Sequence, residues 1–534
     1  MPAVKPPDPS AATGHPARHG AVLLVTCLAL GAVVAAMASL NVALPDLGRE
    51  TRASQTQLSW IVDAYGLVFA ALLLPAGAIG DRFGRRRALL AGLAVYGGGS
   101  GLAALTTDPG TLLVLRGVLG AGAALVMPAT LSTITSTFPR ARRARAVSVW
   151  AAVAGASAVV GLLASGTLLE FWSWRSVFLL NVLLALVALV GTLLFVPESA
   201  EPGAPRVDVV GALLVAAGLA ALVYSVIEAP TRGWGDPATL GGIALGLAVL
   251  AGFTGWELRQ RHPLLDPGLF RNRRFAAGSI SITLQFFAFF GYIFVVMQYL
   301  QLVRGDSALT AALSVLPMAV AMVPLSRLSP VLTGRFGARR PWLAGLLLIA
   351  AALAVLATLD AGSPYGLVLA GLLPLGAGMG LAMTPATTAV TDALPRSLQN
   401  VGSAMNDLSR ELGGALGIAV LGSILSATYR RHLELPGLPA DLADRARSSL
   451  GAASAAGGAV AEQARSAFVD GMRLALLGGA AATLLAALVV ALLLRRPGQP
   501  AEGEPDGADG TVTPADARRA TRATVVRLPE RVDG

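Results

Sequence analysis

Long apolar runs alternate with short polar segments along almost the whole chain. A run of about 20 residues is long enough to cross the roughly 30 Å hydrocarbon core of a bilayer as a helix. Fourteen runs have about this length, and each predicts a membrane-spanning helix. Their expected bounds are 21–44, 58–79, 88–106, 111–134, 145–168, 176–196, 208–228, 239–256, 275–300, 309–328, 342–359, 364–390, 402–427 and 473–494.

The composition agrees with this pattern. Of the 534 residues, 54% are hydrophobic and 13% are charged, whereas soluble domains carry about 25% charged residues. The chain is therefore predicted to be an all-α polytopic membrane protein that lies in a lipid bilayer. The sequence shows no phosphate-binding loop and no cluster of metal ligands, so we expect no enzyme, no cofactor and no metal site.

The arginines predict how the chain is oriented in the membrane. An even number of spans places both termini on one side, and the loops of that side hold most of the loop arginines, as in 82–87, 140–145 and 259–274. Arginine excess marks the cytoplasmic face. We therefore expect cytoplasmic termini, and the net charge of +10 reflects membrane retention rather than nucleic-acid binding. Lys5 is the single lysine, which is typical of a GC-rich bacterial genome and favours a bacterial cytoplasmic membrane.

Two stretches of the chain recur at nearly the same offset. LGAGAALVMPAT at 119–130 matches LGAGMGLAMTPAT at 375–387, and DRFGRRR at 81–87 matches GRFGARR at 334–340. Parallel six-span repeats are one layout of secondary transporters, so the fourteen spans divide as 6+2+6. The expected parts are a disordered N-terminus 1–20, a six-helix bundle 21–196, a two-helix insertion with linkers 197–274, a second bundle 275–494 with an outer loop 428–472, and a disordered tail 495–534.

Three motifs resemble those of a known family. GAIGDRFGRRRALL at 77–90 resembles the loop signature between spans two and three of the major facilitator superfamily. RGVLGAGAA at 116–124 resembles its span-four motif, and NVALP at 41–45 resembles the end of the span-one motif in the drug-exporting branch. Together they resemble the 14-span drug:proton antiporter branch. The resemblance implies proton-coupled export of hydrophobic or cationic small molecules by alternating access, performed by a single chain.

Three positions depart from the pattern of that branch. Ala36 stands where members usually carry an aspartate, Leu119 replaces a glutamine, and Leu162 replaces the proline of the span-five antiporter motif. These departures leave the coupling ion and the direction of transport open. A metabolite transporter with different coupling, for uptake or export, is the nearest alternative, and a membrane sensor that does not transport is a second.

The loop motif is expected to act in gating. Its glycines suit close helix contact and a tight turn, and Asp81 is placed to bind the start of a neighbouring helix or an arginine of the other half. Such a contact would lock the inner gate when it is closed. A charge cluster that serves only retention is the alternative. The gating residues are Gly77, Gly80, Asp81, Arg82, Gly84, Arg85 and Arg86.

Ionisable residues inside spans are costly and point to function. Arg116 in span four needs a counter-charge, and Asp63 enters span two from the same side at similar depth. We expect the two to pair and Asp63 to carry the coupled proton, because a carboxylate changes protonation when its neighbours and its hydration change. The alternative is that Asp63 is a rim residue in contact with interfacial water.

A second charged cluster lies in span thirteen. Asp407 and Glu411 are four residues apart and share a helix face, with Arg410 beside them. They are expected to form a cation or proton site, with an intrahelical salt bridge at the membrane rim as the alternative. Span nine is rich in aromatic residues, which suits amphipathic substrates. The remaining substrate candidates are Asn41, Gln285, Tyr292 and Gln298.

Overall fold

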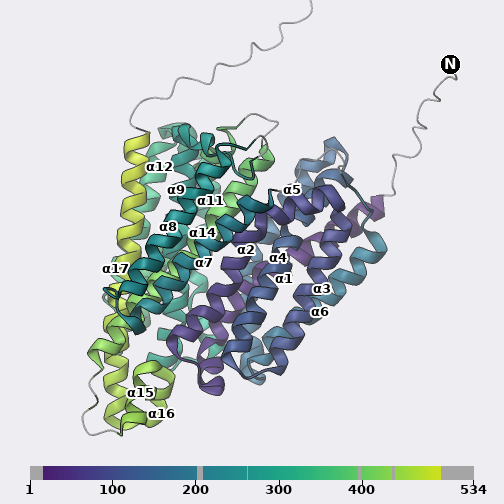
Figure 1. Ribbon diagram of the computed structural model, residues 1–534. Coiled ribbons are helices and arrows are strands. Elements are labelled where there is room, and N and C mark those ends of the chain that lie inside the picture. Colours follow the sequence, from purple (N-terminus) through teal and green to yellow (C-terminus); the bar gives the residue numbers. More distant parts are fainter. Residues whose placement is uncertain are drawn as a thin grey trace, which may run out of the picture. The chain divides into compact units, whose positions relative to one another are not determined.

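The computed structural model of the protein describes residues 16–200, 208–260, 263–394, 399–433, 435 and 439–494. The predicted disordered tails, 1–20 and 495–534, lie almost entirely outside these residues. All regular secondary structure of the described residues is helical, and fourteen helices are long and apolar enough to span a membrane. The expected fold class and all fourteen predicted spans are confirmed (Figure 1).

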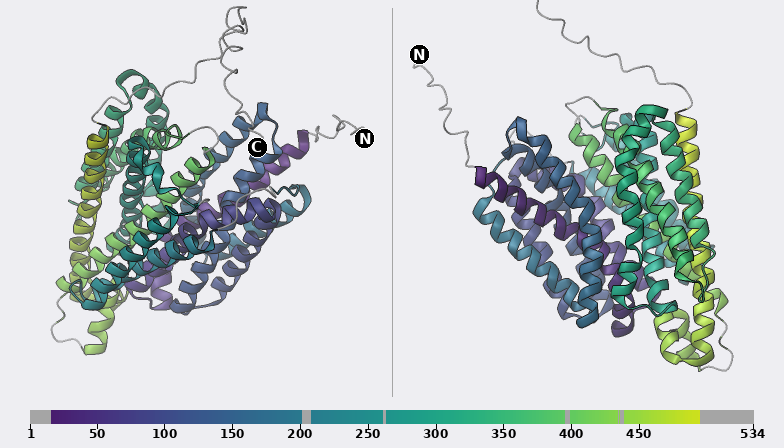
Figure 2. Two further views of the ribbon diagram at one scale, coloured as in Figure 1. Left: turned by 45° about the horizontal axis from the view of Figure 1, so that its top comes forward. Right: turned by 180° about the vertical axis from the view of Figure 1, so that it is seen from behind.

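The first six helices form the N-terminal half, drawn in purple to blue in Figures 1 and 2. The closest pairs are α2 with α4, α3 with α4, α1 with α5, and α3 with α6. The helices are α1 (Pro16–Thr51), α2 (Gln55–Phe83), α3 (Arg85–Leu105), α4 (Pro109–Thr137), α5 (Arg140–Phe171) and α6 (Arg175–Phe195).

The inserted helices α7 (Val209–Arg232) and α8 (Pro237–Glu257) pack against each other. Aspartates cap both at their first turns: Asp208 accepts a hydrogen bond from the Gly211 amide, and Asp236 accepts two from the amides of Ala238 and Thr239. Such caps satisfy backbone N–H groups that have no partner inside the helix. A short 3₁₀ turn, Pro267–Arg271, leads into the second half.

The C-terminal half repeats the arrangement of the first, with two of its spans interrupted. The first span of this half continues from α9 into a π-helical turn, and the second is broken between α10 and α11. The helices are α9 (Arg273–Gln298), η3 (Tyr299–Val303), α10 (Ala308–Ser314), α11 (Leu316–Phe336), α12 (Arg339–Leu356), α13 (Tyr365–Thr391), α14 (Gln399–His432) and α17 (Gly458–Leu493).

Matching glycines pack the helices of the two halves. The backbone of α4 touches α3 where Gly122 faces the Gly92 carbonyl, and α13 touches α12 where Gly378 faces the Gly345 carbonyl. A Cβ atom would lie 2.9 Å from that oxygen in the first case and 2.7 Å in the second, closer than real Cβ atoms approach. Small residues allow such backbone contact, so the sequence repeat is also a repeat of helix contacts.

We call the side on which α1 begins and α17 ends the terminal side, and the opposite one the far side. The long loop after α14 lies on the far side and contains two short helices, α15 (Ala440–Ser448) and α16 (Leu450–Ala456), at the bottom of Figure 1. The Gln301 side chain donates a hydrogen bond of 2.9 Å to the Val42 carbonyl there. A Cβ on Gly166 of α5 would lie 3.0 Å from Leu309 of α10. The two halves are therefore closed against each other at the far side.

Candidate functional site

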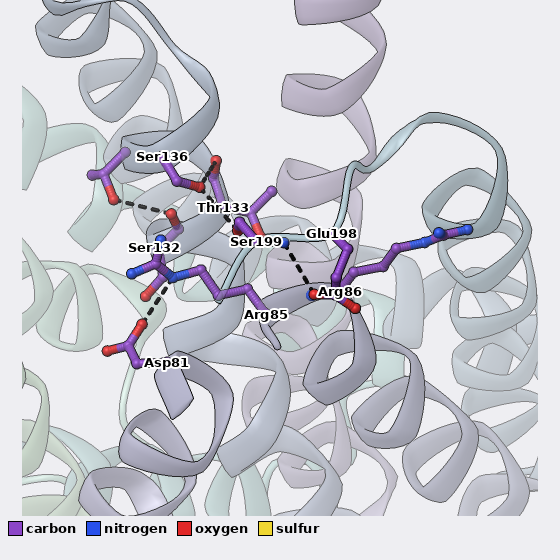
Figure 3. A network of polar contacts seen from close by, with 9 residues as sticks. Asp81, Arg85, Arg86, Ser132, Thr133, Ser136, Glu198 and Ser199 are labelled. Atoms are coloured by element: carbon purple, nitrogen blue, oxygen red, sulfur yellow. Dashed lines mark hydrogen bonds and ion pairs between the residues drawn. The ribbon is translucent and has the colours of Figure 1, made fainter. Parts of the chain in front are cut away.

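The loop motif makes a tight turn between α2 and α3. Gly84 has φ +121°, a conformation that favours glycine, and its amide donates to the Gly80 carbonyl at 3.0 Å. The Asp81 carboxylate accepts a hydrogen bond of 2.8 Å from Arg85 Nε (Figure 3). Of the two partners expected for Asp81, the start of a neighbouring helix or an arginine of the other half, this conformation shows a contact within the same half, because Arg85 is the first residue of α3; pairing with the other half stays a prediction.

A glutamate after α6 holds this turn. Glu198 Oε1 accepts a hydrogen bond of 3.1 Å from the Arg86 amide, and Oε2 lies 3.6 Å from Arg87 Nε (Figure 3). The next residue, Ser199, accepts a hydrogen bond from the Arg85 amide at 2.9 Å. A Cβ on Gly84 would lie 2.7 Å from Glu198 Oε1. The motif is thus a joint between α2, α3 and the end of α6, and the sequence interpretation missed Glu198.

The other motif positions lie around this joint. Gly77 approaches Pro128 of α4 and Gly80 approaches Ala88 of α3, where a Cβ would meet each at 3.4 and 3.3 Å. Arg86 Nη2 donates to the Leu193 carbonyl at 2.7 Å. Arg82 lies over the ring of Phe83. Close helix contact by these glycines is therefore observed, whereas locking of a gate is a hypothesis about another conformation.

Asp63 and Arg116 line one pocket between the two halves. Its walls come from α1, α2 and α4 on one side and from α9 and α14 on the other, including Phe290 and Gly414. The pocket has room for water rather than for a drug-sized ligand. Both charged side chains are 1% exposed, so neither is a rim residue in this structure.

The expected ion pair between them is not formed. Arg116 Nε donates to the Ile61 carbonyl at 2.8 Å, and its guanidinium lies 4.5 Å from the centre of the Tyr65 ring. Both carboxylate oxygens of Asp63 are buried and have no hydrogen-bond partner. The Ile61 carbonyl and the Tyr65 ring of α2 thus bind Arg116. The Asp63 carboxyl group, in the same pocket, has no hydrogen-bond partner.

The second cluster sits on α14 as expected, but its members are loosely joined. Arg410 Nη1 and Asp407 Oδ1 are 4.0 Å apart, and the Arg410 guanidinium lies 4.9 Å from the centre of the Phe286 ring. Glu411 is 8% exposed and its Oε2 has no partner. The predicted intrahelical pair is therefore weak, and Glu411 is free to bind another group.

Of the remaining candidates, Asn41 and the span-nine residues are buried at different places. The Asn41 amide donates to the Met37 carbonyl at 3.0 Å, and its oxygen has no partner. Gln285 donates to Ser281, which also binds Trp342 of α12, so it lies inside the C-terminal half. Tyr292 is fully buried. Gln298 lies at the far side, beside α1 and α16. The structure does not gather these four around one cavity.

One intramembrane charge escaped the sequence interpretation. Arg327 lies within the span Ala308–Phe336, nine residues before its terminal-side end, and is exposed. Ser329, two residues later, donates to the Leu381 carbonyl of α13, so Arg327 lies on the opposite side of α11. An arginine within an apolar run is the signal that should have found it. Among the described residues, no group of three or more His, Cys, Asp and Glu side chains is arranged to hold a metal ion.

The chain is similar to known proteins in sequence and in fold. The model of the Major Facilitator Superfamily matches residues 26–418. The chain is 36% identical to the multidrug resistance protein Stp of Mycobacterium tuberculosis over 77% of this chain and 78% of that protein. It is 32% identical to the tetracenomycin C resistance and export protein of Streptomyces glaucescens, over 90% and 92% of the two chains. The multidrug efflux pump LfrA of Mycolicibacterium smegmatis is 33% identical over 91% and 98%.

A solved structure supports the fold. A bacterial homologue of the human lysosomal transporter Spinster, crystallised in an inward-facing and unoccupied conformation, superposes with a TM-score of 0.66 at 18% identity. The superposition covers 90% of this chain and 98% of that one. The family model covers most of the chain, and the helix contacts repeat between its halves. The chain is therefore a multi-pass membrane protein that belongs to the Major Facilitator Superfamily.

Proposed function

We propose that this chain is a proton-coupled exporter of hydrophobic or cationic small molecules in a bacterial cytoplasmic membrane. The names of three relatives refer to multidrug resistance, antibiotic export or multidrug efflux. The observation that carries the coupling is the buried Asp63 carboxyl group, which has no partner in a pocket between the halves. An ionised carboxylate is costly there, so the group needs either a proton or a nearby cation.

The distribution of arginines supports the proposed orientation. Arg82 to Arg87 lie on the terminal side, which we assign to the cytoplasm. Because the Gln301–Val42 hydrogen bond closes the halves at the far side, we assign this conformation as inward-facing. Cytoplasmic substrate then enters from the terminal side, and rocking of the halves exposes it to the far side. The Asp81 lock would act in the opposite conformation, in which the terminal sides meet.

The carboxyl groups of α14 suit the cationic part of the substrate range. Glu411 and Asp407 lie on α14, where the Arg410 guanidinium lies 4.9 Å from the centre of the Phe286 ring and Gly414 packs against the ring of Phe290. Aromatic faces attract organic cations, and Glu411 Oε2 has no competing partner. The site therefore combines one carboxyl group for the proton with a second acidic group for a cation.

Purified protein in proteoliposomes tests the coupling. An imposed pH gradient is expected to drive accumulation of methyl viologen by the wild type, and Asp63→Asn is expected to abolish this accumulation while downhill exchange continues. Asp46→Asn is the matched control, because Asp46 lies at the far end of α1 and already pairs with Arg49 at 3.0 Å. Undiminished gradient-driven accumulation by Asp63→Asn would contradict the proton-carrier role. The sign of the gradient that drives transport distinguishes export from uptake.

A further inference from the structure

The inserted helix α7 lies on one of two seams between the halves. One seam is formed by α2 and α14, and the other by α5 and α10, the first part of the broken span α10–α11. α7 contacts both α2 and α14 (Figure 1). The three helices share an apolar core, and its buried members are Leu67, Leu219, Val223, Val226, Ile227 and Ala419.

Hydrogen bonds tie α7 to both halves. Trp60 Nε1 of α2 donates to Glu228 of α7 at 3.2 Å. Ser423 of α14 donates to the Val226 carbonyl at 2.6 Å. Because α7 is fixed to each partner and buries apolar side chains between them, this seam is covered where it would otherwise meet lipid.

The other seam is packed at the far side and less closely packed toward the terminal side. Gly166 of α5 touches α10, where a Cβ would lie 3.0 Å from Ala312. Gly155 is eleven residues nearer the terminal side, about three helical turns, and so lies on the same face of α5. Gly155 is exposed, and a Cβ there would meet nothing within 4 Å. α5 contacts the C-terminal half mainly through α10 rather than α11.

The sequence repeat relates the two seams. At an offset of 256 positions, Gly166 corresponds to Gly422, which packs near Ser59 of the other half at 3.1 Å. Gly155 corresponds to Glu411, which is 8% exposed. Equivalent positions thus make equivalent contacts at the far side, whereas nearer the terminal side one seam is covered and the other is open.

On the side of α11 away from α13, apolar side chains are exposed. Val320 is 68% exposed and Val331 is 64% exposed. Arg327 lies on the same side of α11, away from α13, and carries a positive charge. This charge repels cations that are dissolved in the leaflet. The chemistry therefore suits neutral apolar molecules.

We propose that the seam between α5 and α11 is a lateral entrance for neutral apolar molecules dissolved in the inner leaflet, and that α7 closes the matching route between α2 and α14. This inference rests on the export function and the orientation proposed above. Water-soluble cations take the other path, directly from the cytoplasm into the space between the halves. The two inserted helices thereby make entry from the membrane one-sided.

Gly155→Trp tests the entrance, because a large side chain there projects into the gap. Efflux-deficient cells are preloaded with Nile red, a neutral membrane-dissolved dye, and are then re-energised. We expect the variant to lower the rate of Nile red export about tenfold, a rise of roughly 1.4 kcal/mol in the barrier, and to leave methyl viologen export unchanged. Gly252→Trp on α8 is the control, because Gly252 is also exposed with nothing within 4 Å.

Each of the other possible outcomes contradicts the proposal of a lateral entrance. Normal Nile red export by Gly155→Trp, with methyl viologen export intact, removes the entrance and leaves the export function standing. Equal loss of both probes shows that Gly155 serves the conformational change rather than entry. A wild-type protein that exports neither probe contradicts the export function itself, and the entrance with it.

Discussion

Gly120 and Gly376 occupy the same place in the two six-helix halves, four residues after Arg116 and after its counterpart Leu372. Gly120 packs against the Tyr65 carbonyl of α2 and Gly376 against the Met318 carbonyl of α11, each so closely that a Cβ would overlap the oxygen. The contact is repeated in full. The charge one turn away exists in only one half.

The other intramembrane charges follow the same rule. In the sequence repeat, Leu316 is the position equivalent to Asp63, and Gly155 is the position equivalent to Glu411. Packing constraints act on both halves alike, since each must bring helices into backbone contact. A buried charge is costly and is kept only where it has a task. The comparison therefore separates residues that build the fold from residues that perform transport.

The largest expected effect breaks the repeated contact. Gly120→Leu and Gly376→Leu each force a side chain into a neighbouring backbone carbonyl. Overpacking of this kind costs about 1–3 kcal/mol or more, so both variants are expected to lose most folded protein to a similar degree. Thermal unfolding in detergent, followed by size-exclusion chromatography, measures this loss.

Gly98→Leu is the matched control for that experiment. Gly98 lies on α3, is exposed, and has no atom within 4 Å of a Cβ. We expect it to unfold like the wild type. If only one of the two packing variants were destabilised, the halves would not share their helix contacts in solution.

The next largest effect distinguishes the loop motif at 81–87 from its repeat at 334–340 by the loss of transport that each variant causes. Gly84 and Gly337 both have positive φ, +121° and +76°, but a Cβ would meet Glu198 only at Gly84. Both valine variants are strained by about 1–2 kcal/mol, and Gly84→Val also disturbs the joint with Glu198. We expect transport at matched expression to fall severalfold further in Gly84→Val than in Gly337→Val, measured as methyl viologen efflux. Equal losses would mean that the Glu198 contact has no role.

The sequence predicted the fold far better than the site. Span lengths and the repeat were sufficient for the fold, because apolar length and glycine spacing depend on local sequence. Whether two charged side chains pair depends on their rotamers and on whether a backbone carbonyl lies closer to the arginine than the carboxylate does. Arg116 binds the Ile61 carbonyl and the Tyr65 ring instead of Asp63. Glu198 lies beyond the motif in sequence and joins it only after α6 folds back.

A smaller effect tests the acidic residue that lacks a counterpart. Glu411→Gln removes a carboxyl group one turn before Gly414, which packs against the Phe290 ring of α9, and is expected to weaken methyl viologen export by about fivefold, or roughly 1 kcal/mol. Nile red export should change little, because a neutral molecule does not need the charge. Glu170→Gln, at the far end of α5, is the control. Equal losses for both probes would indicate that Glu411 serves structure.

The smallest effect concerns the two charge pairs themselves. Double-mutant cycles compare Asp63 with Arg116 and Asp407 with Arg410, using unfolding free energies in detergent. Asp407 and Arg410 are 4.0 Å apart and partly exposed, so a coupling of about 0.2–1 kcal/mol is expected. Asp63 has no partner and Arg116 is held by α2. Their effects should therefore add within about 0.5 kcal/mol, even though each single variant is destabilised. A larger coupling between Asp63 and Arg116 would mean that the ion pair predicted from the sequence forms in solution. The proton would then have to compete with an arginine for the carboxyl group.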